Sequence, residues 1–381
     1  MPDAESIVPY RPGLEGVTAG ISGVSDIVAE ENKLLYRGYD IRELAENSEF
    51  EEVAYLVLYG ELPNATQLSQ FKAELVANRE VPEHVYQALR ALPKEAAQNM
   101  MSVLQMGVAA LGATEPLARD NSHEANLKKA IKLTGQMATL VANGYRAVSG
   151  KATVPGDPNL GHAANFLYML HGEKPNDLFA KVMNLTFILY AEHGYNASTF
   201  TARVVASTLA GLHSAVAAAI GALHGNLHGG ANEAVMDDML SIGTSDRAEG
   251  WVRERLASKH RIMGFGHREY KTGDTRAAIL GTYVDQLAEL TGKSDLAKMQ
   301  RIMRETVLNE KGLHPNVDFP AAPIYYMMDI PIPLYTPIFA AARITGWSAH
   351  VIEQHDGNRL IRPRSDYNGP APRPYVPIAQ R

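Results

Sequence analysis

The chain has 381 residues, which is long enough for a large domain plus a smaller one. Its composition, 46% hydrophobic and 20% charged, is ordinary for a globular protein. The net charge of −6 argues against a general nucleic-acid-binding protein, which needs a basic surface. The absence of cysteine excludes disulfides, thiolate metal sites and cysteine nucleophiles.

The first residues, MPDAESIVPYRPG, carry neither a basic start nor an apolar run. No signal peptide is therefore expected, and the protein is predicted to be cytoplasmic. Residues 204–222 are the strongest candidate for a membrane span, but His213 and several serines and threonines interrupt them. A buried core or interface helix fits this stretch better than a membrane span.

In chain order, β-branched and apolar residues separated by glycines predict a small hairpin within residues 17–36. The apolar spacing becomes helical from Ile41 onward, with a helix over residues 50–58 that ends at Gly60. Asn64 then opens the next helix. Further helices are predicted over residues 127–141, 163–170, 178–190 and 199–223, with an exposed loop at 155–158.

The composition changes near Gly225. Polar amphipathic helices run to about residue 307, a Pro-rich turn spans 314–323, and an apolar helix follows over 338–347. The tail from Pro363 has little helix signal. We predict an all-α fold with a short N-terminal hairpin, in which a small domain (225–325) is inserted into a large one (1–224 and 326–381).

One stretch, residues 263–276, gathers several groups that could hold a ligand. Gly264 and Gly266 leave the main chain uncovered, so that a ligand could lie directly on it. His267 follows at once, and Lys271 and Arg276 supply cations. The stretch could be a proton donor beside an anion clamp, or a helix-to-helix turn with solvated charges.

Histidines occur in four other notable places. His193 follows an apolar helix, His228 lies at a Gly/Asn turn predicted to be a helix N-terminus, and His350 and His355 lie near the end of the chain. Exposed N–H groups at a helix N-terminus disfavour protonation, so a neutral His228 could donate a hydrogen bond to a developing oxyanion. The thirteen histidines are scattered without an H-E-x-x-H pair, so no metal site is predicted.

Three charged residues complete the candidate set. Asp318 lies in an apolar, Pro-bounded turn, where partial desolvation would make its carboxylate a stronger base; it could equally be a turn residue. Arg343 lies inside an apolar helix, where a buried guanidinium needs an anion partner, either internal or a bound dicarboxylate. Arg362 is either a solvated tail charge or a donor to a site, on its own chain or on a neighbouring subunit.

The phosphate-binding motifs GxxxxGK[ST] and GxGxxG and the hydrolase motif GxSxG are absent, which weakens kinase, ATPase, dehydrogenase and hydrolase interpretations. What is left is His and Asp acid–base chemistry on an anion held by several arginines.

At this point the sequence resembles the citrate synthase family, from Gly13 to Pro370. The resemblance is strongest in residues 36–41 (Tyr-Arg-Gly-Tyr-Asp-Ile), 193–200, 227–233, 264–276, 315–318 and 339–354. The length is similar to that of the short, dimeric bacterial and archaeal type. The family fold is nearly all helical, and its small domain closes over oxaloacetate.

The resemblance implies roles for the candidates. His228 would hydrogen-bond the acetyl-CoA thioester oxygen while Asp318 removes a methyl proton, and His267 would donate to the oxaloacetate carbonyl oxygen. The substrate-binding set for oxaloacetate would be His193, Arg276, Arg343 and, from the partner subunit of a homodimer, Arg362. CoA would lie on Gly264, Phe265 and Gly266, with a phosphate on Lys271; no cofactor or metal is implied.

The sequence departs from the family pattern at Glu269, Thr275 and residues 319–323. The last of these lie beside the acyl group, so 2-methylcitrate synthase, which uses propionyl-CoA, or a bifunctional enzyme is the alternative to citrate synthase. One methylene is worth only about 1–3 kcal/mol in an apolar pocket. A helical dimeric protein with a relic site that binds dicarboxylate or CoA without turnover, or a helical metal-binding protein, would be a different class.

Overall fold

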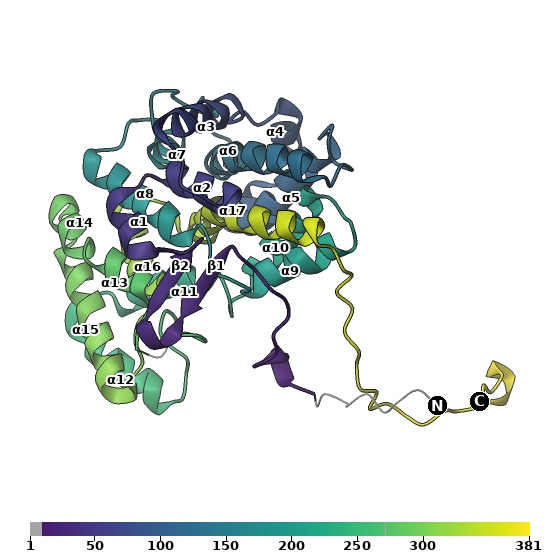
Figure 1. Cartoon of the computed structure of the whole chain (residues 1–381). Helices are drawn as coiled ribbons and strands as arrows, with labels where there is room; N and C mark the ends of the chain where they lie inside the picture. The colour runs from purple at the N-terminus through teal and green to yellow at the C-terminus, as the bar shows by residue number, and fades with distance from the viewer. Residues whose placement is uncertain (1–9, 271) are drawn as a thin grey trace.

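The computed structural model describes residues 10–270 and 272–381, and this part of the chain is nearly all helical, as predicted (Figure 1). The strands are β1 (Ser25–Val28), β2 (Lys33–Tyr36) and β3 (Tyr39–Asp40). The α-helices are α1 (Ile41–Asn47), α2 (Phe50–Tyr59), α3 (Ala65–Ala77), α4 (Glu83–Arg90), α5 (Met100–Ala113), α6 (His123–Val148), α7 (His162–His171), α8 (Asp177–Tyr190), α9 (Ala197–Ser207), α10 (Leu212–Leu223), α11 (Ala231–Ile242), α12 (Ala248–Ala257), α13 (Thr275–Gly281), α14 (Val284–Thr291), α15 (Ser294–Lys311), α16 (Asp318–Met327) and α17 (Tyr335–Asp356). Short 3₁₀ turns are η1 (Pro12–Leu14), η2 (Ala29–Glu31), η3 (Lys94–Gln98), η4 (Ser245–Arg247), η5 (Ile332–Leu334) and η6 (Ile378–Gln380).

The predicted N-terminal hairpin is present, although it is shorter than the stretch that suggested it. β1 pairs antiparallel with β2, in a register that places Ser25 opposite Tyr36. Asn32, in the left-handed region at φ 51°, makes the turn. A short third strand, β3, pairs with β2 and was not predicted.

Local signals in the sequence place several helix ends correctly. Gly60 ends α2 in a left-handed conformation, and Asn64 opens α3 with a capping box to Gln67. The continuous helix predicted over residues 199–223 is instead two helices, α9 and α10. The break contains Leu209 at φ 64° and Gly211, where an added Cβ would lie 2.3 Å from the carbonyl oxygen of Ala118.

The apolar helix α17 runs through the centre of the molecule, longer at both ends than predicted (Figure 1). It packs against α6, α9, α10, α8 and α2, and its side chains are buried almost all round. Helices hydrophobic on every face need such complete cover. Arg343, in the middle of α17, therefore lies in the core and is only 1% exposed.

Helices α11 to α16 form a group beside α8 and α17, drawn in green in Figure 1. Within it α12 packs on α15, and α16 packs on α11, α13 and α14. The group contacts the rest of the chain mainly through α11, which packs on α17 and η5, and through α13, which packs on α8 and α1. The candidate site described below lies near these contacts.

The Pro-rich stretch 314–323, predicted as a turn, is partly helical: α16 begins at Asp318. Proline is tolerated in the first turn of a helix, whose N–H groups lack helical partners, and Pro320 lies there. Pro323 lies inside the helix and removes one backbone hydrogen bond. Asp318 is therefore the first residue of a buried helix.

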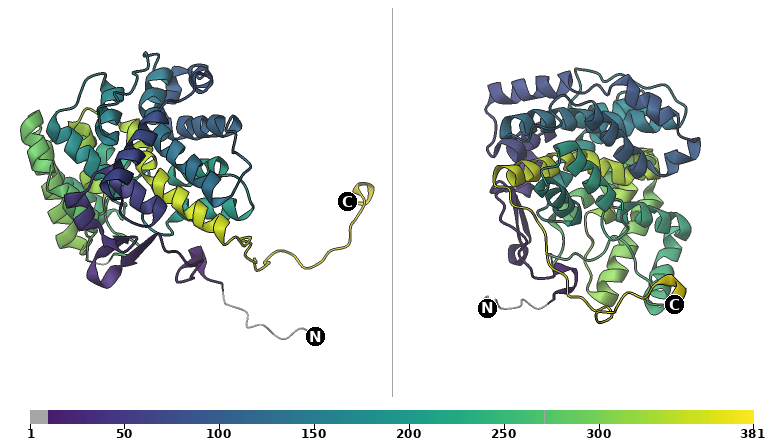
Figure 2. Two further views of the ribbon diagram at one scale, coloured as in Figure 1. Left: turned by 45° about the horizontal axis from the view of Figure 1, so that its top comes forward. Right: turned by 90° about the vertical axis from the view of Figure 1, so that its right-hand side faces the viewer.

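Both ends of the described chain leave the helical body as extended arms, which Figure 2 shows from two further directions. After α17 the C-terminal arm has no regular structure except η6, in line with the weak helix signal from Pro363. Across the described residues, no helix combines the length and the apolar character that a bilayer span requires.

Gly346 on α17 provides a test of how tightly the segment after α8 packs on this helix. An added Cβ would lie 2.1 Å from Glu192 Oε2 and 2.5 Å from the carbonyl oxygen of Ala191. We expect Gly346→Ala to lower the free energy of unfolding by about 2 kcal/mol or more, as overpacking does. In the matched control Gly281→Ala, on α13, a new Cβ would have no atom within 4 Å. Urea denaturation showing equal effects for both variants would contradict the close packing.

Candidate active site

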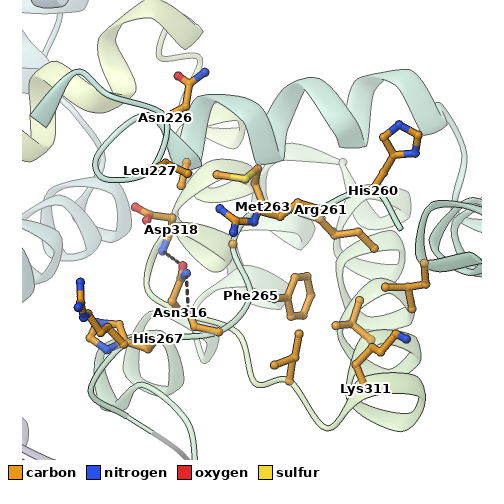
Figure 3. A pocket seen from close by; sticks show the side chains of 18 of the residues that line it. Asn226, Leu227, His260, Arg261, Met263, Phe265, His267, Lys311, Asn316 and Asp318 are labelled. Atoms are coloured by element: carbon orange, nitrogen blue, oxygen red, sulfur yellow. Dashed lines mark hydrogen bonds between the residues drawn. The ribbon is translucent and has the colours of Figure 1, made fainter. Parts of the chain in front are cut away.

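A cavity of about 730 Å³ opens between α11, the loop 259–268, α15 and the start of α16 (Figure 3). Six residues of the predicted site line it: His228, Gly264, Phe265, Gly266, His267 and Asp318. Segments more than 90 residues apart in sequence thus meet around one space.

The glycine loop is fixed against the start of α16. Gly264 and Gly266 have φ of 83° and 80°, which favours glycine over other residues. The Asn316 amide donates to the carbonyl oxygen of Gly264 (2.9 Å), and the Gly266 amide donates to that of His314 (2.8 Å). A Cβ on Gly264 would lie 3.0 Å from that of Phe319, so the bare backbone allows the loop to approach α16.

His228 lies in the turn before α11, two residues ahead of its N-cap Gly230, and not at the helix N-terminus as predicted. Its pKa is nevertheless lowered, to about 4, by burial first and by the charge of Arg343 second. Ring Nε2 accepts from the Ser198 amide (3.4 Å) and lies 2.9 Å from the Ser198 hydroxyl. Because an amide N–H can only donate, the neutral ring carries its proton on Nδ1.

His267 has the opposite tautomer. Its Nδ1 accepts from the backbone amides of Glu269 (3.1 Å) and Tyr270 (3.3 Å), so the ring proton is on Nε2. The chain itself curls back after His267 to fix this orientation. The site therefore contains two histidines that can each donate one hydrogen bond, from different ring nitrogens.

Asp318 is 8% exposed, and burial raises the pKa of its carboxyl to about 7. Arg276 and Arg343 oppose this rise, while Asp274 adds to it. Its backbone amide donates to Asn316 Oδ1 (3.1 Å), as Figure 3 shows. Side-chain Oδ1 is buried and has no hydrogen-bond partner among the described residues, so the carboxylate can accept a proton.

Arg276 opens α13 beside a partner that the sequence interpretation missed. Asp274 accepts from Arg276 Nε (3.0 Å) and Nη2 (2.8 Å), and also from the Val317 amide (3.1 Å), directly before Asp318. Burial opposes the charge of Arg276, but Asp274 outweighs it and raises the pKa. The sequence did contain a signal for this pair: an Asp at a helix N-cap, two residues before the Arg, can cap the helix and also bind the Arg side chain.

Arg343 confirms the expectation of a buried guanidinium. Its Nε donates to the carbonyl oxygen of Tyr190 (2.7 Å), and its Nη2 is buried without a hydrogen-bond partner among the described residues. Burial lowers the pKa of Arg343 to about 10, against the opposing charge of Glu192. A buried N–H with no acceptor is the feature that a bound carboxylate would satisfy.

His193 follows α8 and lies beside His267, which lines the cavity. Its ring centre lies 5.1 Å from that of His267, and Nε2 is 3.2 Å from the Tyr270 hydroxyl. Burial, and then the charges of Arg276, His267 and Arg343, lower the pKa of His193 well below its ordinary range. It is a neutral hydrogen-bonding group among cations.

Two further predicted residues remain. Arg362 is exposed on the C-terminal arm, away from this group, and Lys271 lies outside the described residues. Four cations not assigned from the sequence do line the cavity, namely Lys259, Arg261, Arg268 and Lys311. The Lys-His-Arg run shortly before the glycine loop was the available signal for the first two. Among the described residues, no group of three or more His, Cys, Asp or Glu could hold a metal ion.

The family model for the C-terminal domain of citrate synthase matches residues 13–364. The chain belongs to the citrate synthase family. Citrate synthase 2 of Bacillus subtilis is 44% identical over 97% of this chain and 98% of its own length. 2-Methylcitrate synthase of Shewanella oneidensis is 41% identical over 100% of both chains.

Solved citrate synthases share the fold. That of Pyrobaculum aerophilum is 39% identical with a TM-score of 0.89, over 97% of this chain and 95% of its own. That of Thermoplasma acidophilum, solved with carboxymethyl-coenzyme A and oxaloacetate, is 33% identical with a TM-score of 0.92, over 98% and 100%. Family membership confirms the all-α fold and the acyltransferase class, while relatives of both names leave the acyl donor open.

The raised pKa of Asp318 predicts a pH-dependent change in stability. Between its ordinary pKa of about 3.9 and the folded value of about 7, the unfolded chain has lost a proton that the folded protein keeps. Stability due to this group therefore falls as pH rises through that range. We expect Asp318→Asn to gain stability relative to the wild type between pH 4 and pH 8, by at most about 4 kcal/mol. Denaturation at both pH values measures the gain, and an identical difference at each would refute the raised pKa.

Proposed function

We propose that the protein condenses acetyl-CoA with oxaloacetate and water, giving citrate and CoA. The observation that carries this is the pairing of a desolvated carboxylate, Asp318, with a neutral histidine, His228, on one cavity. This pair suits the removal of a proton next to a carbonyl.

In the first step Asp318 would take a proton from the thioester methyl group. A thioester α-proton is far too weakly acidic for a solvated carboxylate of pKa about 3.9. The burial of Asp318 makes it a stronger base, and a hydrogen bond from His228 Nδ1 would stabilise the enol oxygen as it forms. The neutral state of His228 matters here, since its pKa of about 4 leaves the ring uncharged at neutral pH.

In the second step the enol carbon would attack the oxaloacetate carbonyl. His267, with its proton on Nε2, would donate to that oxygen as it becomes negative. Arg276, Arg343 and His193 would hold the dicarboxylate, because they bring two guanidinium groups and a neutral hydrogen-bonding ring together in the protein interior. Hydrolysis of the citryl thioester would then release citrate and CoA.

CoA would lie along the glycine loop, with its adenine end on Gly264, Phe265 and Gly266. Lys259, Arg261, Arg268 and Lys311 give this cavity a cationic lining suited to its phosphates, and Lys271 would take a further phosphate. Residues 225–325 would form a small domain that closes over bound oxaloacetate and excludes water until the carbon–carbon bond has formed. The enzyme would need no cofactor or metal and would work in the cytoplasm.

The enzyme would be a homodimer in which Arg362 reaches the partner's active site. The extended C-terminal arm, on which Arg362 is exposed, supports this arrangement, because the arm has little contact with its own helical body (Figure 2). Removing apolar surface from water is favourable. A second protomer would bury part of the arm and would gain a cation for its oxaloacetate.

2-Methylcitrate synthesis from propionyl-CoA is the second candidate, and a bifunctional enzyme is a third. Relatives of both names match the chain almost end to end. Phe319, Ala321 and Ala322, directly after Asp318, are fully buried. The fit of one extra methyl group next to the base would therefore decide the acyl preference.

The direct test mixes the purified protein with oxaloacetate and either acetyl-CoA or propionyl-CoA and follows release of the CoA thiol. The chain has no cysteine, so the protein contributes no thiol background. We expect thiol release that depends on oxaloacetate, and the ratio of the two rates gives the acyl preference. An absence of release with both donors would contradict the enzyme assignment.

Mixed dimers test the role of Arg362. We expect Arg362→Ala and Asp318→Asn to be nearly inactive alone, while dimers formed from both recover one intact site. Random pairing in an equal mixture predicts about a quarter of wild-type activity. If the mixture, unfolded and refolded together, stays as inactive as its components, Arg362 does not act across the interface.

A further inference from the structure

The buried carboxylate of Glu192 lies beside the proposed oxaloacetate subsite but has no part in the proposed reaction. Glu192 directly precedes His193 and is 0% exposed. A fully buried carboxylate normally has partners that compensate its charge. Its contacts therefore indicate what it does.

One oxygen of Glu192 holds the turn that presents His193. Oε1 accepts from the Gly194 amide (2.5 Å), the Ser25 hydroxyl (2.8 Å) and His350 Nε2 (2.9 Å). The bond to Gly194 closes the backbone around His193, which lies between the two residues. The bonds to Ser25 on β1 and His350 on α17 attach this turn to two separate elements.

The second oxygen lies against the helix that carries Arg343. Oε2 is buried without a hydrogen-bond partner among the described residues, at the place where Gly346 allows closest approach to α17. Arg343 precedes Gly346 by three residues, on the same side of the helix. Its own Nη2 is buried and likewise unpartnered in the described chain. Burial would raise the pKa of Glu192, but His350 first and Arg343 next outweigh it.

We propose that Glu192 is a positioning residue of the oxaloacetate subsite: it fixes the turn that carries His193 and supplies the buried negative charge that balances Arg343 until a substrate carboxylate binds. The subsite itself belongs to the proposed function, on which this inference rests. Without this charge, Arg343 would turn toward another acceptor, and the Nη2 that awaits the substrate would no longer be in place. A carboxylate that only repelled the doubly negative oxaloacetate would have the opposite effect, because its loss would tighten oxaloacetate binding.

The test is Glu192→Gln, measured as the dissociation constant of oxaloacetate by calorimetry, with kcat at saturating substrates measured separately. Glutamine keeps the size and one acceptor oxygen but removes the charge. We expect the dissociation constant to rise about tenfold or more, which is about 1.4 kcal/mol, while kcat falls less than threefold. Affinity that is unchanged, or tighter, would overturn the proposal.

Glu353→Gln is the matched control. Glu353 is also a carboxylate on the His350 side of this network, but it pairs with Arg203 and with the Gly23 amide. We expect this variant to leave oxaloacetate affinity within about threefold of the wild type. An equal loss in both variants would show a general disturbance of the network and would overturn the specific role of Glu192.

If Glu192→Gln does not fold, Glu192→Asp takes its place, because it keeps the charge and withdraws the carboxylate by one methylene. We then expect oxaloacetate affinity at least threefold weaker at an unchanged kcat. Wild-type affinity in this variant would also overturn the proposal. A wild-type protein that binds no oxaloacetate would instead refute the proposed function, so the two failures are distinguishable.

Discussion

The site depends on the burial of charged groups that water would otherwise stabilise. Asp318, Arg276, Arg343 and Glu192 are all at least nine-tenths buried, and they lie at the meeting point of α13, α16, α17 and the end of α8. Isolated ions are very costly at such depth, so each must be balanced by another. The balance is incomplete in a specific way, because Arg343 Nη2 and Asp318 Oδ1 have no hydrogen-bond partner among the described residues. In the proposed reaction, a carboxylate of the substrate would meet Arg343 Nη2 and the acidic C–H would meet Asp318 Oδ1.

The same burial sets the protonation states that the proposed chemistry needs. It raises the pKa of Asp318, so that its carboxylate is a stronger base, and it lowers the pKa values of His228 and His193, so that both rings are neutral. Backbone amides that donate to one ring nitrogen of His228 and of His267 determine the tautomer of each ring. If the proposed roles hold, packing and main-chain geometry do much of the work of preparing these side chains for the reaction.

The sequence predicts the all-α fold, which the structure confirms, because apolar periodicity is a local signal. His193, His228, His267, Asp318 and Arg343 are buried or line the cavity, and their roles stay predictions. The sequence could not show that Asp274 links Arg276 to the start of α16, since that contact joins segments more than 40 residues apart. The prediction of a turn over residues 314–323 was wrong, because the prolines suggest a turn while the burial of Phe319 and its neighbours favours a helix. The sequence interpretation also attributed the neutral state of His228 to a helix terminus, whereas burial and Arg343 cause it.

The central claim is that the protein interior turns the Asp318 carboxyl into a base. The most direct measurement is a ¹³C NMR titration of the protein labelled at the aspartate γ-carbon, with Asp318→Asn used to assign the resonance. We predict a titration midpoint for Asp318 of about 7 in the substrate-free protein. A midpoint at the ordinary aspartate value of about 4 would contradict the account.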